Sequence, residues 1–215
     1  MFGDNVARYA ARMPTPDLVL ASASPRRSQL LRQIGVAHLV RPVDVDETIR
    51  SGEAPADYVR RIARDKAQVR AVREESGTSL AVLGSDTAVV LDGEVFGKPR
   101  DREDALRMLG RLSGRTHEVH TAVALAYRDR LECRLSVSEV TFRTLGPGEI
   151  DAYWASGEPA DKAGAYAIQG LAAVFVSRIC GSYSGIMGLP LYETAELLRL
   201  AGVMPGCRDP DRRDS

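Results

Sequence analysis

Apolar and polar positions divide this chain into short buried runs and longer amphipathic segments. Residues 18–21 form a continuous apolar run of strand length, and residues 29–34 place leucine and isoleucine at helical spacing. A longer apolar run over residues 79–91 predicts a second buried strand. Asp92-Gly93 after it predicts a tight turn into a partner strand over residues 94–99. These patterns predict a strand and helix followed by a hairpin.

Helical and strand patterns continue to interleave along the rest of the chain. Four further segments have the apolar spacing of helices: residues 55–75, 101–112, 147–156 and 189–200. Residues 116–127 and 131–144 predict a long hairpin, and residues 163–168 and 172–179 predict shorter strands. We therefore predict an α/β fold with a mixed sheet.

Composition is typical of a soluble globular protein. The 215 residues are 44% hydrophobic, enough for one domain, which we assign to residues 17–202 with poorly ordered extensions at 1–16 and 203–215. The formal net charge is +0, so no overall field attracts nucleic acid or a membrane surface. Without a membrane-length apolar stretch or a signal-peptide profile, we expect a cytoplasmic protein. The three cysteines are scattered, which favours neither a disulfide framework nor a zinc site.

The segment Ser22-Ala23-Ser24-Pro25-Arg26-Arg27 departs from the usual pattern of a helix start. Ser24 takes the N-cap position and Pro25 the first helical position, where its missing N–H costs nothing. Arg26 and Arg27 then lie at the positive end of the helix dipole, where cations are disfavoured. Hydroxyls, guanidinium groups and free backbone N–H groups at one point are typical of a phosphate site. From this segment alone, a capped helix with two solvated arginines is an equally good interpretation.

Asp86 interrupts the second apolar run and is the strongest candidate for a catalytic group. A carboxylate among apolar residues is costly unless a cation, a metal or hydrogen bonds compensate it. The alternative is an aspartate that turns the chain and bonds Thr87. We favour the catalytic interpretation because Lys98 lies at the end of the hairpin that folds back on this strand.

Lysine is rare in this chain: among 29 basic residues, only Lys66, Lys98 and Lys162 are lysines. A chain that prefers arginine keeps lysine where a compact ammonium group is needed, although chance survival is the alternative. Lys66 lies at the edge of the apolar face of the helix predicted over residues 55–75, so we expect it to point along the core. Tyr153, in a short predicted helix, is interpreted as a packing residue.

An acidic cluster of Asp44, Asp46 and Glu47 can supply oxygen ligands to Mg²⁺ or Mn²⁺, although a solvated acidic loop is the commoner meaning of such a cluster. The chain has no P-loop motif and no G-x-G-x-x-G helix start. Residues 181–185 superficially match a hydrolase elbow but carry Tyr183 where the nucleophile would stand. An anion-binding helix start, a buried carboxylate and well-placed lysines instead predict phosphoanhydride hydrolysis by metal-activated water, with Asp86 as the base.

Eight blocks of this sequence share the order and spacing of one known family: residues 21–27, 46–47, 66–67, 84–87, 97–99, 112–117, 161–170 and 187–190. Over residues 18–200 the chain therefore resembles the Maf family of nucleoside triphosphate pyrophosphatases. All three lysines fall inside these blocks. The resemblance implies an elongated mixed sheet with flanking helices and two lobes around a central cleft, similar to the inosine triphosphate pyrophosphatases. It also implies cleavage of a nucleoside triphosphate to the monophosphate and pyrophosphate, with Mg²⁺ or Mn²⁺.

The resemblance also implies roles for particular residues. Asp86 would be the proton acceptor, with Lys98, Lys66 and Glu47 around the phosphates and the metal. Glu47 and Asp86 would be the metal ligands. The residues implied to bind substrate are Ser22, Ser24, Arg26, Arg27, Thr87 and Gln169. Of these, Arg26, Thr87 and Gln169 match the branch that prefers dTTP and UTP, and a glutamine amide can both donate and accept along a uracil-like edge.

These residues lead to two functional hypotheses. The first is a dTTP/UTP pyrophosphatase, with modified pyrimidine nucleotides as further substrates, that cleans the nucleotide pool; a homodimer is an expectation of the resemblance alone. The second is a nucleotide-sensing regulator of cell division and septum formation without significant turnover. Asp86 beside Lys98 favours the first, because a pure binding protein gains little from a carboxylate base beside a triphosphate.

Overall fold

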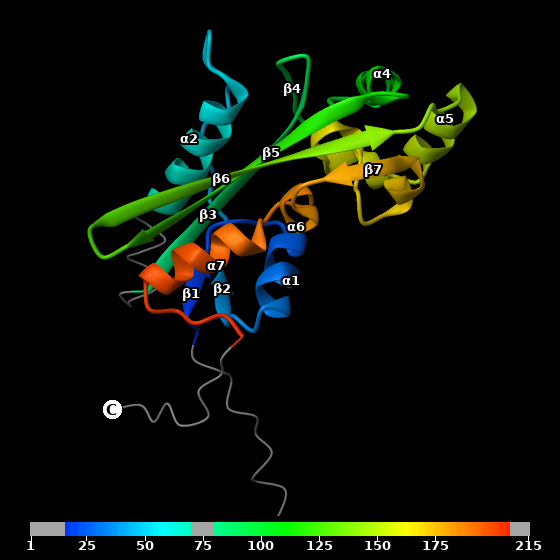
Figure 1. Ribbon diagram of the computed structural model, residues 1–215. Helices are drawn as coiled ribbons and strands as arrows, with labels where there is room; N and C mark the ends of the chain where they lie inside the picture. Colours follow the sequence, from blue (N-terminus) through cyan, green and yellow to red (C-terminus); the bar gives the residue numbers. More distant parts are fainter. Residues whose placement is uncertain (1–15, 70–79, 207–215) are drawn as a thin grey trace, which may run out of the picture.

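The computed structural model describes residues 16–69 and 80–206, which contain one mixed seven-stranded sheet with helices on both faces (Figure 1). The strand order is β2-β1-β3-β5-β6-β7, with β4 paired to β3 outside this path. The strands are β1 (Leu18–Leu20), β2 (His38–Val40), β3 (Ala81–Leu91), β4 (Glu94–Phe96), β5 (Thr116–Tyr127), β6 (Arg130–Phe142) and β7 (Val176–Cys180). The helices are α1 (Pro25–Gln33), α2 (Pro55–Gln68), α4 (Arg102–Leu112), α5 (Pro147–Ala155), α6 (Tyr183–Met187) and α7 (Leu191–Leu200). Because β1 runs parallel to β3 while β5 runs antiparallel to it, the predicted mixed sheet is confirmed.

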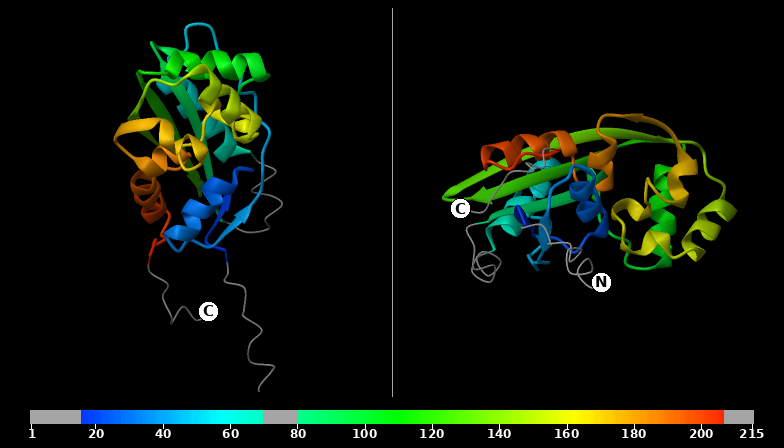
Figure 2. Two further views of the ribbon diagram at one scale, coloured as in Figure 1. Left: turned by 90° about the vertical axis from the view of Figure 1, so that its right-hand side faces the viewer. Right: turned by 90° about the horizontal axis from the view of Figure 1, so that it is seen from below.

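The long strands β3, β5 and β6 extend through the molecule and support a lobe at each end (Figures 1 and 2). In one lobe, α1 and α7 pack on the sheet through buried residues such as Leu31 and Leu198. In the other, α4, α5 and several short turns enclose a core that includes Leu109 and Phe142. Helix α2 covers the opposite face of the sheet, where Ile62 is fully buried. The elongated, two-lobed α/β architecture expected from the sequence is confirmed.

Helix α2 lies very close to β3 because β3 carries glycine at their point of contact. A Cβ atom on Gly84 would stand 2.3 Å from the carbonyl oxygen of Ala63 and 2.7 Å from the amide nitrogen of Ala67, both in α2. Any side chain at this position would therefore push the helix away from the sheet. The close approach brings Lys66 of α2 against Asp86, two residues further along the same face of β3.

Local signals located most of the elements correctly. Asp92 and Gly93 both have positive φ, 54° and 80°, as a tight turn between antiparallel strands requires. This turn joins β3 to β4 as predicted. The helix predicted over residues 55–75 is confirmed as far as Gln68, and residues 70–75 lie outside the described part of the chain.

The strand predicted over residues 163–168 is wrong, and the one predicted over 172–179 is confirmed only from Val176 onward. This segment contains the 3-10 turns η3 (Ala163–Ala165) and η4 (Leu171–Phe175), and a further one, η2 (Glu158–Asp161), precedes it. Gly164 and Ala165 have φ of 67° and 59°, a left-handed conformation that a strand does not accommodate. The core around α4 and α5, rather than strand pairing, buries five apolar side chains of this segment: Ala165, Tyr166, Ile168, Ala172 and Phe175.

The first residues of the C-terminal extension contact the fold. Val203 packs on the core beside α7, and the Gly206 N–H donates to the carbonyl of Ile34 at 2.8 Å. Residues 1–15 and 207–215 lie outside the described ranges. None of the helices within residues 16–69 and 80–206 combines the length and hydrophobicity needed to cross a bilayer.

Candidate active site

A cleft of about 730 Å³ opens where one edge of β3 lacks a neighbour among the described strands. β1 pairs with β3 only as far as Leu83, and β4 pairs with it only from Val89. The intervening part of β3 contributes Asp86 and Thr87 to the cleft. Helix α1 begins just after β1 ends, the location where α/β sheets commonly bind ligands. The break in strand pairing therefore opens β3 to side chains from both lobes.

All ten residues predicted to act in the site line this cleft: Ser22, Ser24, Arg26, Arg27, Glu47, Lys66, Asp86, Thr87, Lys98 and Gln169. Lys162 lines it too, so the three lysines of the chain converge on one cavity. The lining carries five basic and three acidic side chains, although the chain as a whole has a net charge of +0. This local excess of positive charge favours an anionic ligand.

Lys66 bridges two carboxylates within the cleft. Its Nζ donates to Asp86 Oδ1 at 2.9 Å and lies 2.6 Å from Glu47 Oε1. Lys66 and Asp86 are only 8% and 7% exposed, so bulk water screens their interaction poorly. Burial raises the pKa of Asp86, and the charges of Lys66 and Arg27 oppose this rise only in part. The buried carboxylate predicted from the sequence is confirmed, and its environment makes it more basic than an exposed aspartate.

The environment shifts the pKa of Glu47 in the opposite direction. Burial acts to raise it, but the hydrogen bond and charge of Lys66, together with the charges of Lys98 and Arg27, lower it overall. Neighbouring carboxylates whose pKa values are pushed apart are typical of sites where one carboxylate exchanges protons and the other stays ionised.

Glu47 is the one member of the predicted acidic cluster that lines the cleft. The Asp46 carboxylate instead accepts the backbone N–H of Thr48 at 2.9 Å, so the solvated-loop interpretation holds for this residue. The described ranges contain no group of three or more histidine, cysteine or acidic side chains placed to bind a metal ion. Glu47 and Asp86 nevertheless lie close together, with one oxygen of each in contact with the Lys66 ammonium. Two carboxylates fit Mg²⁺ or Mn²⁺, because such ions are commonly bound by one or two carboxylates together with substrate phosphates.

Arg27 joins the residues just before its own helix to two distant segments at the cleft. Its Nε donates to the Gly188 carbonyl at 2.8 Å, Nη1 to Ser22 Oγ at 3.0 Å and Nη2 to Thr87 Oγ1 at 3.3 Å. The solvated-arginine interpretation is therefore wrong for Arg27. Ser24 occupies the N-cap position as predicted, but its hydroxyl makes no capping bond.

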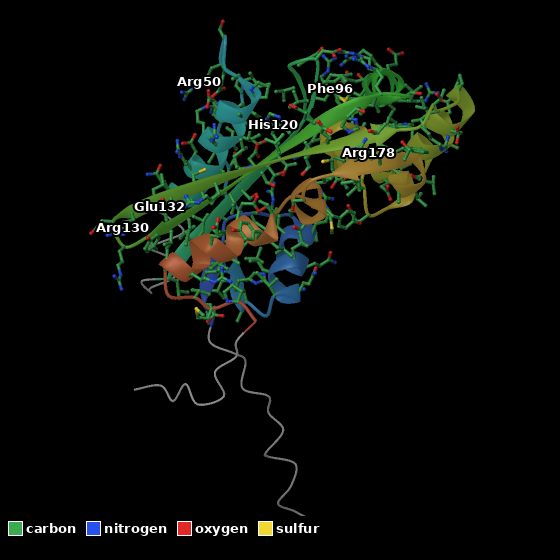
Figure 3. The ribbon with its side chains drawn as sticks, in the orientation of Figure 1. Arg50, Phe96, His120, Arg130, Glu132 and Arg178 are labelled. Carbon is green, nitrogen blue, oxygen red and sulfur yellow. The ribbon has the colours of Figure 1, made fainter. Side chains whose placement is uncertain are left out.

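The second wall of the cleft comes from the β4 hairpin and the turns that follow α5. Figure 3 labels Phe96, which is 1% exposed and has the Arg111 guanidinium 4.7 Å from its ring centre. This packing anchors the hairpin two residues before Lys98. The Gly164 N–H donates to the Gly97 carbonyl at 3.0 Å, so the hairpin is tied to the turn that follows Lys162.

Tyr153 has a polar role that the sequence interpretation missed. The residue is buried, but its hydroxyl donates to Glu158 Oε1 at 2.7 Å and accepts the backbone N–H of Ala167 at 3.1 Å. The sequence could indicate only that the Tyr153 hydroxyl makes some hydrogen bond, because the hydroxyl of a buried tyrosine usually finds a partner. The partners themselves lie 5 and 14 residues away, beyond what helical spacing indicates.

A family model described as Maf-like protein matches residues 17–201. The chain belongs to the Maf family. Its Maf relatives include the dTTP/UTP pyrophosphatase of Methylococcus capsulatus, 58% identical over 188 residues, which cover 86% of this chain and 91% of that protein. The protein of the same name from Bordetella parapertussis is 56% identical over 194 residues, which cover 87% of this chain and 94% of that protein. The one from Methylobacillus flagellatus is 51% identical over 193 residues, which cover 89% of this chain and 96% of that protein. The solved structure of the Staphylococcus aureus Ham1 protein matches 58% of this chain and 71% of its own at 15% identity, with a TM-score of 0.37, too small a likeness to bear on the site. The family resemblance inferred from the motifs is confirmed.

Proposed function

We propose that this Maf protein is a nucleoside triphosphate pyrophosphatase that converts dTTP and UTP to the monophosphate and pyrophosphate. The observation that carries the proposal is the buried Lys66–Asp86 pair, in a cleft with five basic side chains on its lining. Relatives named dTTP/UTP pyrophosphatase, at 51% to 58% identity, support the substrate class. Modified pyrimidine nucleotides would be further substrates. A cytoplasmic location stays an expectation of the sequence, and a homodimer stays an expectation of the family resemblance.

In the proposed reaction, Asp86 accepts a proton from the attacking water. A bond forms between the water oxygen and the α-phosphorus, the bond from that phosphorus to the bridging oxygen breaks, and pyrophosphate leaves. The raised pKa of Asp86 suits this role, because a stronger base receives the proton more readily. Lys66 orients the carboxylate by its hydrogen bond to Oδ1.

Glu47 and Asp86 would hold Mg²⁺ or Mn²⁺ in this proposal. Such an ion supplies positive charge that neutralises the phosphates and the leaving pyrophosphate. Lys98 would assist, because its charge is close enough to lower the pKa of Glu47.

The two lobes would bind opposite ends of the nucleotide. Ser22, Ser24 and Arg26 lie at the start of α1, where hydroxyls, a guanidinium group and backbone N–H groups favour phosphate. Arg27 would hold Ser22 and Thr87 in place through its hydrogen bonds. Gln169 lines the cleft from the other lobe and is exposed. In this proposal it contacts the base, and Arg26 and Thr87 contribute to base choice.

Pyrophosphate release from a panel of nucleotides tests the proposal. Purified protein is incubated with dTTP, UTP, CTP, ATP or GTP and either Mg²⁺ or Mn²⁺, and turnover of dTTP and UTP is expected. No turnover by folded protein would refute the enzyme hypothesis and favour the nucleotide-sensing regulator. Preference for a purine would refute the assignment of Gln169 while leaving the reaction intact. Asp86→Asn should lose turnover but keep nucleotide binding, whereas the control Asp129→Asn, in the exposed turn between β5 and β6, should keep both.

A further inference from the structure

The turn that carries Gln169 is held at both ends by one pair of side chains. On one side, the Ala167 N–H donates to the Tyr153 hydroxyl at 3.1 Å. On the other side, the Leu171 N–H donates to Glu158 Oε2 at 3.1 Å. The Tyr153 hydroxyl donates in turn to Glu158 Oε1 at 2.7 Å, which joins the two ends. Residues 168–170 are therefore enclosed by a single hydrogen-bonded pair.

Tyr153 is itself rigidly placed by packing. It lies on α5, is 4% exposed, and meets the ring of Phe175 edge-on at 5.1 Å between centroids. Burial and the hydrogen bond to Glu158 raise the pKa of Tyr153, so its hydroxyl keeps its proton and remains a donor. The turn is thus attached to a helix of the second lobe through a fixed phenol group.

Glu158 occupies space that only glycine leaves open. A Cβ atom on Gly170 would stand 2.1 Å from Glu158 Oε2, so the carboxylate lies directly against the backbone of the turn. The Gly170 N–H closes the turn by donating to the Ala167 carbonyl at 3.0 Å. This contact leaves the turn little room to move toward Glu158.

We propose that Tyr153 and Glu158 are positioning residues that set base selectivity by holding the turn around Gln169. The inference rests on the proposed function, in which Gln169 contacts the base. A hydrogen bond to a base edge needs a donor–acceptor distance of about 2.7–3.2 Å, so a shift of about 1 Å in the turn breaks it. Lys66 and Asp86 stand on α2 and β3 and bond each other. Loosening the turn therefore weakens base recognition while leaving the proton-accepting pair in place.

Tyr153→Phe tests the proposal because it removes one hydroxyl and keeps the ring packed on Phe175. The KM for UTP should rise about tenfold with kcat within about twofold, and the ratio of kcat/KM for UTP to that for CTP should fall about tenfold. The matched control is Tyr127→Phe, the same change at a buried tyrosine at the end of β5, which should leave both parameters unchanged. A merely structural role would lower the folded fraction, and so reduce the rate for both nucleotides equally. An unchanged selectivity ratio would therefore overturn the proposal.

A second variant tests the proposal if Tyr153→Phe misfolds, and a second measurement tests it without relying on turnover. Glu158→Gln keeps the size of the side chain but replaces one accepting oxygen by an NH₂ group, and it should reduce selectivity to a similar extent. In both variants, amide hydrogen exchange at Ala167 and Leu171 should be about tenfold faster without any nucleotide present, while exchange in β5 is unchanged. Unchanged exchange would refute the positioning role whatever the activity. Absence of turnover by the unaltered protein would instead refute the proposed function, and base selectivity with it.

Discussion

Replacing Lys66 by methionine should destabilise the protein, and more strongly at neutral than at acidic pH. Methionine retains an apolar stem but removes the ammonium group that lies 2.6 Å from Glu47 Oε1 and 2.9 Å from Asp86 Oδ1. Asp86 is 7% exposed, so water cannot readily replace the lost cation. In the variant, the neighbouring carboxylates of Glu47 and Asp86 would lack the positive charge that now lies between them.

The size of the effect follows from the burial of the two carboxylates. Removing one partner of a buried ion pair costs about 3–5 kcal/mol, because the remaining charge is left uncompensated. The Glu47 side chain is 47% exposed and can turn toward water, so most of the penalty falls on Asp86. We therefore expect the lower end, about 3 kcal/mol, which is a large part of the roughly 5–15 kcal/mol that stabilises a typical domain.

The pH dependence follows from the direction of the Asp86 shift. Burial raises the pKa of Asp86 above its unfolded value, and the charge of Lys66 opposes that rise. Without Lys66 the folded-state pKa rises further. A carboxyl group whose pKa is higher in the folded than in the unfolded state stabilises the fold most at pH values below its unfolded-state pKa, which is about 3.9 for aspartate. This stabilisation is lost as the pH rises through the folded-state pKa. The stability difference between variant and unaltered protein should therefore shrink as the pH falls through the raised folded-state pKa toward the unfolded value of about 3.9.

Urea unfolding followed by circular dichroism at several pH values measures this difference. The double variant Lys66→Met with Asp86→Asn should recover most of the lost stability, because the uncompensated charge is gone. Lys98→Met, at an exposed lysine of the same cleft, should change stability by less than about 0.5 kcal/mol. A loss below about 1 kcal/mol for Lys66→Met, or one independent of pH, would refute the reasoning.

Three further predictions concern catalysis and packing. Asp86→Asn should reduce kcat by about 10²- to 10⁴-fold with a small change in KM, and steady-state kinetics with UTP would contradict a proton-accepting role if kcat fell less than tenfold. In the metal-free protein, an NMR titration of the Asp86 carboxyl should give a midpoint above the unperturbed value of about 3.9, because burial raises its pKa; a midpoint at or below that value would contradict the proposed environment of this carboxylate. Gly84→Ala should lower the free energy of unfolding in urea by about 1–3 kcal/mol and lower kcat by displacing Lys66. The control Gly110→Ala should do neither, because a Cβ atom there meets nothing within 4 Å.

Features whose signals lie within a few residues of one another were predictable from the chain alone. Ser24 and Pro25 mark the start of α1, Asp92-Gly93 marks the hairpin, and apolar spacing marks α2. Asp86 was recognisable as a buried carboxylate because every neighbouring position in its strand is apolar or small. These signals are local, since they depend on backbone conformation and on the burial of single residues.

Contacts between distant segments were decided only by the tertiary structure. Arg27 bonds Gly188, 161 residues away, and nothing in the helix-start motif indicates that partner. Residues 163–168 have the polarity of a strand but form turns, because a polarity pattern records that a segment is buried and not what buries it. The backbone N–H groups at the Gln169 turn bond the side chains of Tyr153 and Glu158 instead of a neighbouring strand.

The same distinction applies to the proposed catalytic pair. The sequence identifies Lys66 as a helix-edge lysine and Asp86 as a strand carboxylate, each by its own surroundings. Whether the two meet depends on the distance between α2 and β3, which is short because Gly84 carries no Cβ atom. That distance is a property of how two elements pack, and no pattern along one of them contains it.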